Sequence, residues 1–135
     1  MDGARRIEKL LRQQRALATF GSFAFAEPDL RKILTQAARI CADCLGVAHC
    51  KICMHRATED DLLIVAGCGW QDGVVGQVVS QANETSPQGR AFMTGQPVIL
   101  PDIRGANDLE LPAFYGAHAI ASTVDVLIPG FRSAP

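Results

Sequence analysis

The sequence lacks an excess of charge of either sign and any long apolar run. Thirteen Lys and Arg residues stand against fourteen Asp and Glu residues, so no global field attracts phosphate backbones or anionic lipids. No stretch reaches the roughly 18 consecutive apolar residues of a membrane-spanning helix, and charges interrupt the N-terminal segment every few residues. We therefore expect a cytoplasmic protein with no nucleic-acid partner and no membrane insertion.

Motifs of common catalytic sites are also absent. The sequence contains no glycine-flanked serine elbow, no HExxH pair and no phosphate loop of the GxxxxGK type. These absences argue against a serine hydrolase, a zinc protease and a nucleotide-hydrolysing enzyme. We therefore expect no enzymatic activity.

Cysteine is present at five positions, but none follows Cys68. Four of the five stand in the run CADCLGVAHCKIC, which contains two CxxC pairs. Zinc ribbons present each pair on a tight turn and separate the pairs by a longer stretch. Helical spacing instead places Cys41 and Cys44 on a core-facing row, and strand alternation places Cys50 and Cys53 on opposite faces. We predict no metal site, and reduced thiols that line or flank a core.

Helical periodicity extends from Arg5 to about Phe25. Its apolar residues recur at spacings near three and four: Ile7, Leu10, Leu11, Leu17, Ala18 and Phe25. The stripe is narrow, which is typical both of a helix that pairs with its own copy and of a helix that packs on its own core. We interpret residues 1–15 as a helical extension, 16–130 as one domain and 131–135 as a tail.

A second helix is predicted to have Pro28 in its first turn, followed by Asp29, and to end at Gly46, which suits a C-terminal stop. Its apolar stripe comprises Leu30, Ile33, Leu34, Ala37, Ala38, Cys41 and Cys44. The runs VAHCKICMHR and LLIVAGCGW then predict a strand hairpin. The following stretch to Gly89 is rich in Gly and polar residues and is interpreted as a long connection, of the kind that often forms one wall of a ligand site.

The C-terminal half predicts short helices between strands. Ser86 and Pro87 open the helix PQGRAFMT, which Gly95 closes, and the strand PVIL follows. A short helical stretch, LPAFYGAHA, then precedes the strand STVDVLI. Strands mixed with helices in this order predict an α+β fold, with a sheet backed by helices.

Two runs carry a resemblance to a known family. The run GRAFMTGQPVILPDI, followed after a loop by FYGAHAIASTVDVLIPG, resembles the core of a GAF domain, as does the preceding helix that feeds a strand hairpin. The resemblance covers roughly residues 16 to 130 and implies an antiparallel sheet backed by the N-terminal helices. It also implies a sensory or regulatory domain of a signalling protein such as a sensor histidine kinase, which binds a small molecule or only dimerises.

The resemblance is incomplete at the C-terminal end. In the family, another apolar strand and a long helix follow the strand that corresponds to STVDVLI, whereas this sequence ends at PGFRSAP. We therefore expect a C-terminally truncated GAF-like sheet with unpaired edges and exposed apolar surface, features that promote association. The predicted partner is a second copy, bound through the N-terminal helix and the exposed sheet edge.

The resemblance further implies a set of ligand-binding residues: Trp70, Phe92, Asp102, Phe114, Tyr115, His118, Thr123 and Asp125. Free N–H groups of the helix opened by Ser86 could also accept an anionic group. Trp70, Phe92 and Phe114 suit packing of the core or of the cavity wall better than specific ligand contacts. Asp125 would need a partner if it is buried in its strand, or it lies on an exposed strand face. No cofactor is identified.

The family resemblance also implies two related chemistries, and the sequence lacks the cysteines for both. Reduction of free methionine sulfoxide needs thiols near the short middle helix and the loop after the next strand, where this sequence has none. No cysteine between Ala91 and Pro135 could carry a bilin, whereas noncovalent tetrapyrrole binding stays open. Two other readings remain: a structural dimerisation module without a ligand, and a redox sensor with Cys53, beside Lys51 and His55, as its reactive thiol.

Overall fold

The computed structural model describes residues 2–130, so the predicted tail lies outside the described residues. The chain divides into two compact units. The first unit comprises the residues up to Met54 together with Ile64–Val78, and the second comprises His55–Leu63 together with the residues from Val79 onward. The elements combine helices with antiparallel strands, which confirms the predicted α+β class.

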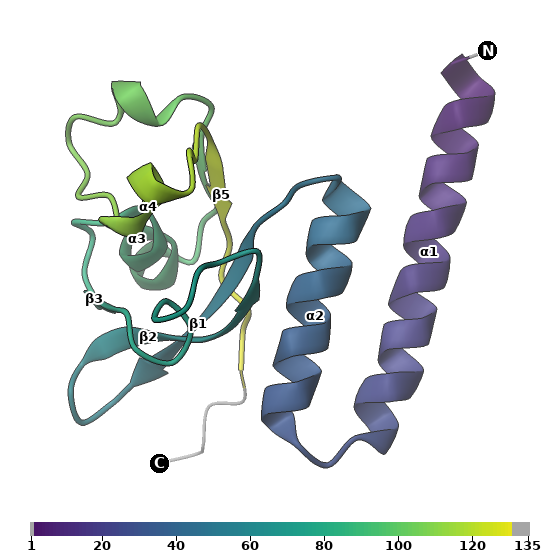
Figure 1. Ribbon diagram of the computed structural model, residues 1–135, viewed down its shortest axis with the longest axis horizontal. Helices are drawn as coiled ribbons and strands as arrows, with labels where there is room; N and C mark the ends of the chain where they lie inside the picture. The colour runs from purple at the N-terminus through teal and green to yellow at the C-terminus, as the bar shows by residue number, and fades with distance from the viewer. Residues whose placement is uncertain (1, 131–135) are drawn as a thin grey trace. The chain divides into compact units, whose positions relative to one another are not determined.

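Two helices dominate the first unit. Helices α1 (Asp2–Ala26) and α2 (Leu30–Leu45) lie side by side and run in opposite directions (Figure 1). The side chain of Asp29 accepts a hydrogen bond from the N–H of Arg31 and caps α2, which ends at Gly46 in the left-handed conformation. Pro28 lies before this cap, so its predicted place in the first turn of the helix is wrong.

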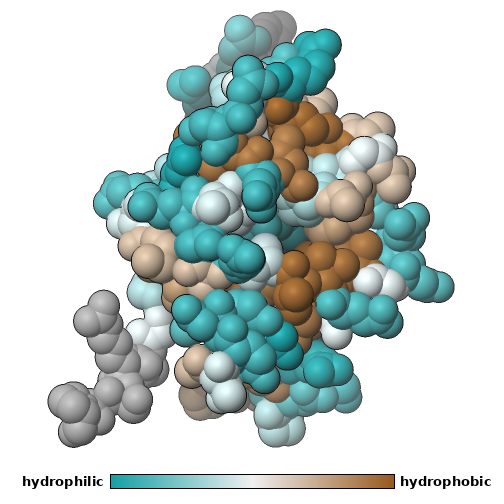
Figure 2. Space-filling model, turned by 90° about the vertical axis from the view of Figure 1, so that its left-hand side faces the viewer, coloured by the Kyte–Doolittle hydropathy of each residue, from teal (hydrophilic) through white to brown (hydrophobic). Residues whose placement is uncertain are grey.

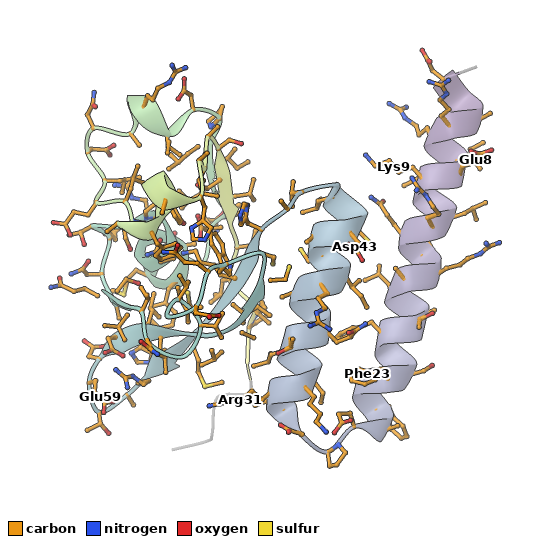
Figure 3. The ribbon with its side chains drawn as sticks, in the orientation of Figure 1. Glu8, Lys9, Phe23, Arg31, Asp43 and Glu59 are labelled. Atoms are coloured by element: carbon orange, nitrogen blue, oxygen red, sulfur yellow. The ribbon has the colours of Figure 1, made fainter. Side chains whose placement is uncertain are left out.

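Helix α1 has two different apolar faces. Its half-buried residues, which recur every three or four positions and face α2, are Gln13, Ala16, Phe20, Phe23 and Ala24. The Gln13 side chain donates a hydrogen bond to the carbonyl of Cys44. Figure 3 shows Lys9 and Phe23 on the side of α1 that faces α2, and Glu8 on the other side. A separate stripe stays 52–60% exposed, comprising Ile7, Leu10, Leu11 and Leu17.

Helix α1 buries none of its residues. Although α1 is long, neither it nor any other helix among residues 2–130 has a stretch apolar enough to cross a membrane. On α2, Ala38 and Ala42 are buried, but Leu30 and Cys41 are exposed. The prediction that Cys41 faces a core is therefore wrong.

A three-stranded sheet has the order β1 (Cys50–Arg56), β2 (Asp61–Cys68) and β3 (Val79–Gln81). Alternate residues of β2, Leu62, Ile64 and Ala66, are buried, as expected for a strand with one covered face. Strand β3 pairs antiparallel with β2, with Leu62 opposite Ser80. The segment predicted as a connection therefore contains a short strand.

The second unit holds helix α3 (Pro87–Thr94), strand β4 (Val98–Leu100), the 3-10 turn η1 (Ile103–Gly105), helix α4 (Phe114–Ala117) and strand β5 (Thr123–Asp125). The predicted ends of α3 are confirmed. Ser86 Oγ accepts a hydrogen bond from the N–H of Gly89, and Gly95 closes the helix in the left-handed conformation. Strands β4 and β5 form their own antiparallel pair, on which α3 packs (Figure 1).

One face of the β4–β5 pair is exposed. Ile99 and Val124 stand opposite each other and are 62% and 64% exposed. Beyond β5, Val126, Leu127 and Ile128 are exposed as well. Figure 2 shows hydrophobic residues at the molecular surface on the face that it draws. The second unit therefore leaves apolar surface in contact with solvent.

Candidate functional site

A cavity of about 440 Å³ lies in the second unit, beside η1. Its lining comes from two segments and comprises Pro101, Asp102, Ile103, Arg104, Ile120 and Ala121. The N–H of Ile103 donates to the carbonyl of Ala121 at 2.9 Å and joins the segments. Four of the six lining residues, Pro101, Asp102, Arg104 and Ala121, are exposed, so the cavity is open to solvent.

An ion pair supplies the charge in the cavity wall. Asp102 caps η1 by accepting the N–H of Arg104, and its Oδ2 lies 2.7 Å from Nη2 of the Arg104 guanidinium. Hydrogen bonds from the guanidinium, and then from the backbone N–H of Arg104, lower the pKa of Asp102. The Arg104 side chain is 87% exposed, so a ligand could meet the guanidinium from the solvent side. Of the predicted ligand-binding residues, Asp102 alone is among those that line the cavity in the described part of the chain.

Two other predicted residues lie on α4, and a third, His118, follows it directly. The rings of Phe114 and Tyr115 meet edge to face at 5.2 Å, and both residues are nearly fully buried. His118 Nδ1 lies 2.9 Å from the carbonyl oxygen of Phe114. Phe114 and Tyr115 therefore form part of the core of the second unit.

Phe92, Thr123 and Asp125 lie on α3 and β5. The Phe92 ring stacks on the His55 ring at 4.8 Å. Thr123 stands opposite Leu100 and has a buried hydroxyl with no hydrogen-bond partner among the described residues. Asp125 stands opposite Val98. None of these three residues is among those that line the cavity, because the lining comes from residues 101–104 and from the segment before β5.

The start of α3, predicted as an anion site, is enclosed. Pro87, Gln88 and Gly89 are all buried, and the Ser86 hydroxyl already accepts the N–H of Gly89. The first turn therefore offers little open surface to an anionic group.

Trp70 belongs to the first unit. Its indole Nε1–H donates to the carbonyl of Cys50 at 2.8 Å, and its ring lies 4.7 Å from that of His49. Gly67 adds to this close packing, because a Cβ there would lie 2.7 Å from the Cys50 carbonyl oxygen. Trp70 therefore fixes the start of β1.

The structure also brings together cysteines that the sequence did not pair. Cys50 lies close enough to Cys41 and Cys68 for both thiols to affect its pKa. Burial, followed by the charge of Cys41 and the hydrogen bond to it, raises the pKa of Cys50 to about 12. No group of three or more His, Cys, Asp or Glu side chains among residues 2–130 is arranged to hold a metal ion.

Two of these arrangements, the position of Cys41 near Cys50 and the lining of the cavity, have no local pattern in the sequence. Helical spacing links Cys41 only with Cys44, whereas in the fold Cys41 also lies near enough to Cys50 to affect its pKa. The cavity residues Arg104 and Ile120 are separated in the chain by a loop and α4, and no local pattern links them. The hydrogen bond from the N–H of Arg104 to Asp102 follows a local pattern. An Asp side chain at a turn commonly accepts a hydrogen bond from the backbone N–H two residues further on.

Comparison with known proteins gives a likeness of fold. No protein-family model matches the sequence, and no curated protein matches it. The GAF domain of a phosphoenolpyruvate-protein phosphotransferase from Coxiella burnetii is 15% identical with a TM-score of 0.69, and the match covers 78% of this chain and 62% of that one. A methyl-accepting chemotaxis protein is 23% identical with a TM-score of 0.64, covering 82% and 71%.

A third similar structure is an enzyme. Free methionine-R-sulfoxide reductase from Neisseria meningitidis, solved with its substrate, is 16% identical with a TM-score of 0.59, and the match covers 73% of this chain and 56% of that one. The chain thus spans less than two thirds of the length of the phosphotransferase domain and of the reductase. What these structures share with it is the order and arrangement of helices and strands. The chain has a GAF-like fold.

Proposed function

We propose that this chain is a sensory or regulatory domain of a signal-transduction protein, with no catalysis of its own. In this proposal it pairs with a second copy through α1 and the exposed sheet edge, and binds a small molecule in the cavity beside η1. The GAF-like fold supports the regulatory role, as does the likeness to a chemotaxis protein. The lack of any cysteine after Cys68 argues against the chemistry of the similar reductase, given the thiol positions that the family resemblance implies.

The exposed stripe of α1 is the observation that carries the proposal. Leu10 and Leu17 lie seven residues apart and are 52% and 58% exposed, while a different face of α1 packs on α2. Burial of an apolar side chain contributes roughly 1.5–3 kcal/mol, so leaving this stripe in water is unfavourable. A second α1 would cover it in the manner of a short coiled coil.

The cavity supports the ligand-binding part. Its wall combines Ile103, Ile120 and Ala121 with the Asp102–Arg104 pair, which is the mixture of apolar surface and few polar groups that small-molecule sites use. An ionised Asp102 beside an exposed guanidinium suits a small ligand that carries a charged group.

A structural module without a ligand is the second candidate. The burial of Phe114 and Tyr115 favours it, because these predicted ligand contacts fill the core of the second unit instead of lining a cavity. Both candidates use α1 for association, and they differ in whether the chain retains a bound molecule.

Native mass spectrometry of the purified chain, combined with sedimentation over a range of concentrations, tests the proposal. We expect a dimer that Leu10→Glu converts to monomer, because a carboxylate cannot be buried in an apolar seam without a partner. Arg15→Glu is the matched control, since it adds a carboxylate to α1 outside the exposed stripe. A monomer at all concentrations, or equal effects of the two substitutions, would reject pairing through α1.

The same native mass spectra test whether the chain retains a bound small molecule. Extra mass that leaves on denaturation, and that is reduced by Ile120→Glu at the cavity wall, would support binding there. A dimer of bare polypeptide that also fails to bind any member of a metabolite library would favour the structural module.

A further inference from the structure

Helix α1 carries an inference that rests on the proposed pairing of two copies and names the orientation of the pair. Its exposed stripe continues beyond Leu17. Phe25 follows Ile7 by eighteen residues, or about five helical turns, so both lie on the same side of α1, and Phe25 is 96% exposed. Between them, Gly21 has nothing within 4 Å of the place where a Cβ would lie. The stripe therefore extends along almost the whole helix.

Helix α2 covers only the later part of α1. The Gln13 side chain donates a hydrogen bond to the carbonyl of Cys44, at the C-terminal end of α2. Every residue from 2 to 12 is exposed, and α1 extends past this end of α2 (Figure 1). We call residues 2–12 the projection. A helix of that length is marginally stable in water on its own, so contact with another surface would stabilise the projection.

The charged side chains of α1 all lie in its first half. Positions 16–26 carry no charged residue. Positions 2–15 carry two carboxylates and five cations, namely Asp2, Glu8, Arg5, Arg6, Lys9, Arg12 and Arg15. The first half of α1 therefore has a net charge of +3, five cations less two carboxylates, and the second half is neutral.

We infer that the two α1 helices pair in antiparallel orientation, so that the projection of each copy lies along the neutral second half of α1 in the other. In this arrangement Ile7 of one copy meets Phe25 of the other. Leu11 then faces Gly21, whose open surface leaves room for a large side chain. Each projection also gains the support of an α1 segment that is itself packed on α2.

A parallel pair would be less favourable for two reasons. It would place both charged halves at the same level, which gathers twice the five cations and two carboxylates within about 20 Å of helix length. Exposed like charges repel within a Debye length of roughly 8–10 Å. A parallel pair would also set the two projections against each other, with no α2 behind either of them.

Photo-cross-linking tests the orientation. Phe25 is replaced by p-benzoylphenylalanine, which keeps an aromatic side chain, and the variant is mixed with isotopically labelled, unsubstituted chain before irradiation. Trypsin then separates the α1 peptides 7–9, 10–12 and 16–31, because it cuts after Arg6, Lys9, Arg12, Arg15 and Arg31. We expect peptide 16–31 to be joined to labelled peptide 7–9 or 10–12.

The matched control is the same replacement at Phe23. This residue belongs to the same tryptic peptide, but it is half-buried and lies on the side of α1 that faces α2 (Figure 3). Its cross-links should therefore join only unlabelled peptides of its own copy.

Opposite charges in the stripe give a second test, read by sedimentation. Ile7→Lys and Phe25→Glu should each weaken the dimer by about tenfold or more, because each brings a charge into an apolar seam. In an antiparallel pair, the double variant sets opposite charges against each other, so it should regain most of the lost affinity. In a parallel pair it would set like charges against each other and bind more weakly than either single variant.

The other outcomes separate the orientation from the pairing itself. Peptide 16–31 joined to its own labelled counterpart, with no recovery in the double variant, would overturn the antiparallel orientation and leave pairing through α1 intact. A monomer at all concentrations, or a dimer without any labelled cross-link from position 25, would reject both the orientation and the proposed pairing through α1.

Discussion

Helices α1 and α3 differ in a way that their lengths do not suggest. Helix α1 has 25 residues and none of them is buried, whereas α3 has eight residues, four of which are buried. Most helical stability in proteins comes from packing of an apolar face and not from propensity. Helix α3 is therefore fixed within its own unit, whereas α1 leaves an apolar stripe in contact with solvent.

The close docking of α3 depends on small residues. Gly89 lies so near the preceding segment that a Cβ would overlap the carbonyl oxygen of Asn83 and lie 3.0 Å from that of Gln81. Ala91 is 2% exposed. By contrast, Gly3 and Gly21 of α1 have nothing within 4 Å of the place where a Cβ would lie. Substitutions in the two helices should therefore differ greatly in effect.

The largest effect is expected for Gly89→Ala. The added methyl group must displace backbone atoms, which cannot rotate away as a side chain could, so we expect a loss of about 3 kcal/mol in the free energy of unfolding. Urea unfolding followed by circular dichroism measures it. The matched control is Gly116→Ala in α4, where a Cβ meets nothing within 4 Å. Equal stabilities of the two variants would contradict the close docking of α3.

A smaller loss is expected for Ser86→Ala. The Ser86 hydroxyl, in a residue only 4% exposed, accepts the N–H of Gly89 at 3.0 Å. Alanine would leave that buried donor unsatisfied, and we expect a loss of about 2 kcal/mol by the same measurement. Recovery of most of this stability in Ser86→Asp would identify the capping bond as the cause, whereas an unchanged midpoint for Ser86→Ala would show that the cap is dispensable.

The N-terminal cap of α2 should contribute less to the free energy of unfolding than the cap of α3. Asp29 accepts the N–H of Arg31 at 2.9 Å, but this bond is exposed, so water can replace the lost acceptor. For Asp29→Ala we expect a loss of about 0.5–1 kcal/mol. Unfolding of Asp29→Asn, which keeps the capping oxygen, separates the bond from the charge. A loss of unfolding free energy larger than that of Ser86→Ala would contradict the expectation that the cap of α3 contributes more than the cap of α2.

Elements that are fixed by local bonds can be predicted from the sequence, whereas elements that depend on distant segments cannot. The ends of α3 were predicted at the correct residues because Ser86, Pro87 and Gly95 act through bonds within the helix itself. Strand β3 was missed because its three residues become a strand only by pairing with β2. The exposure of Cys41 also depends on which distant segments cover α2, so a periodic apolar stripe could not reveal it.

The candidate site was less predictable than the fold. Asp102 was expected at a ligand site and does line the cavity, because it stands where a strand gives way to a turn. Ile120 and Ala121 line the same cavity from a distant segment, and the hydrogen bond between Ile103 and Ala121 joins that segment to η1. The family resemblance pointed to aromatic residues of α4 instead, and these fill the core.

The smallest effect is expected for Leu17→Ala on the exposed stripe of α1. Leu17 is 58% exposed within one chain, so its truncation should change the unfolding free energy of the dilute monomer by less than about 0.5 kcal/mol. At high concentration a dimer would bury Leu17, and the same substitution should then lower the midpoint because association stabilises the folded state. Phe20→Ala, on the face toward α2, is the control, and its effect should be similar at every concentration. A loss above about 1 kcal/mol for Leu17→Ala in the dilute monomer would show that α1 is anchored within its own chain as α3 is, and the contrast between the two helices would fail.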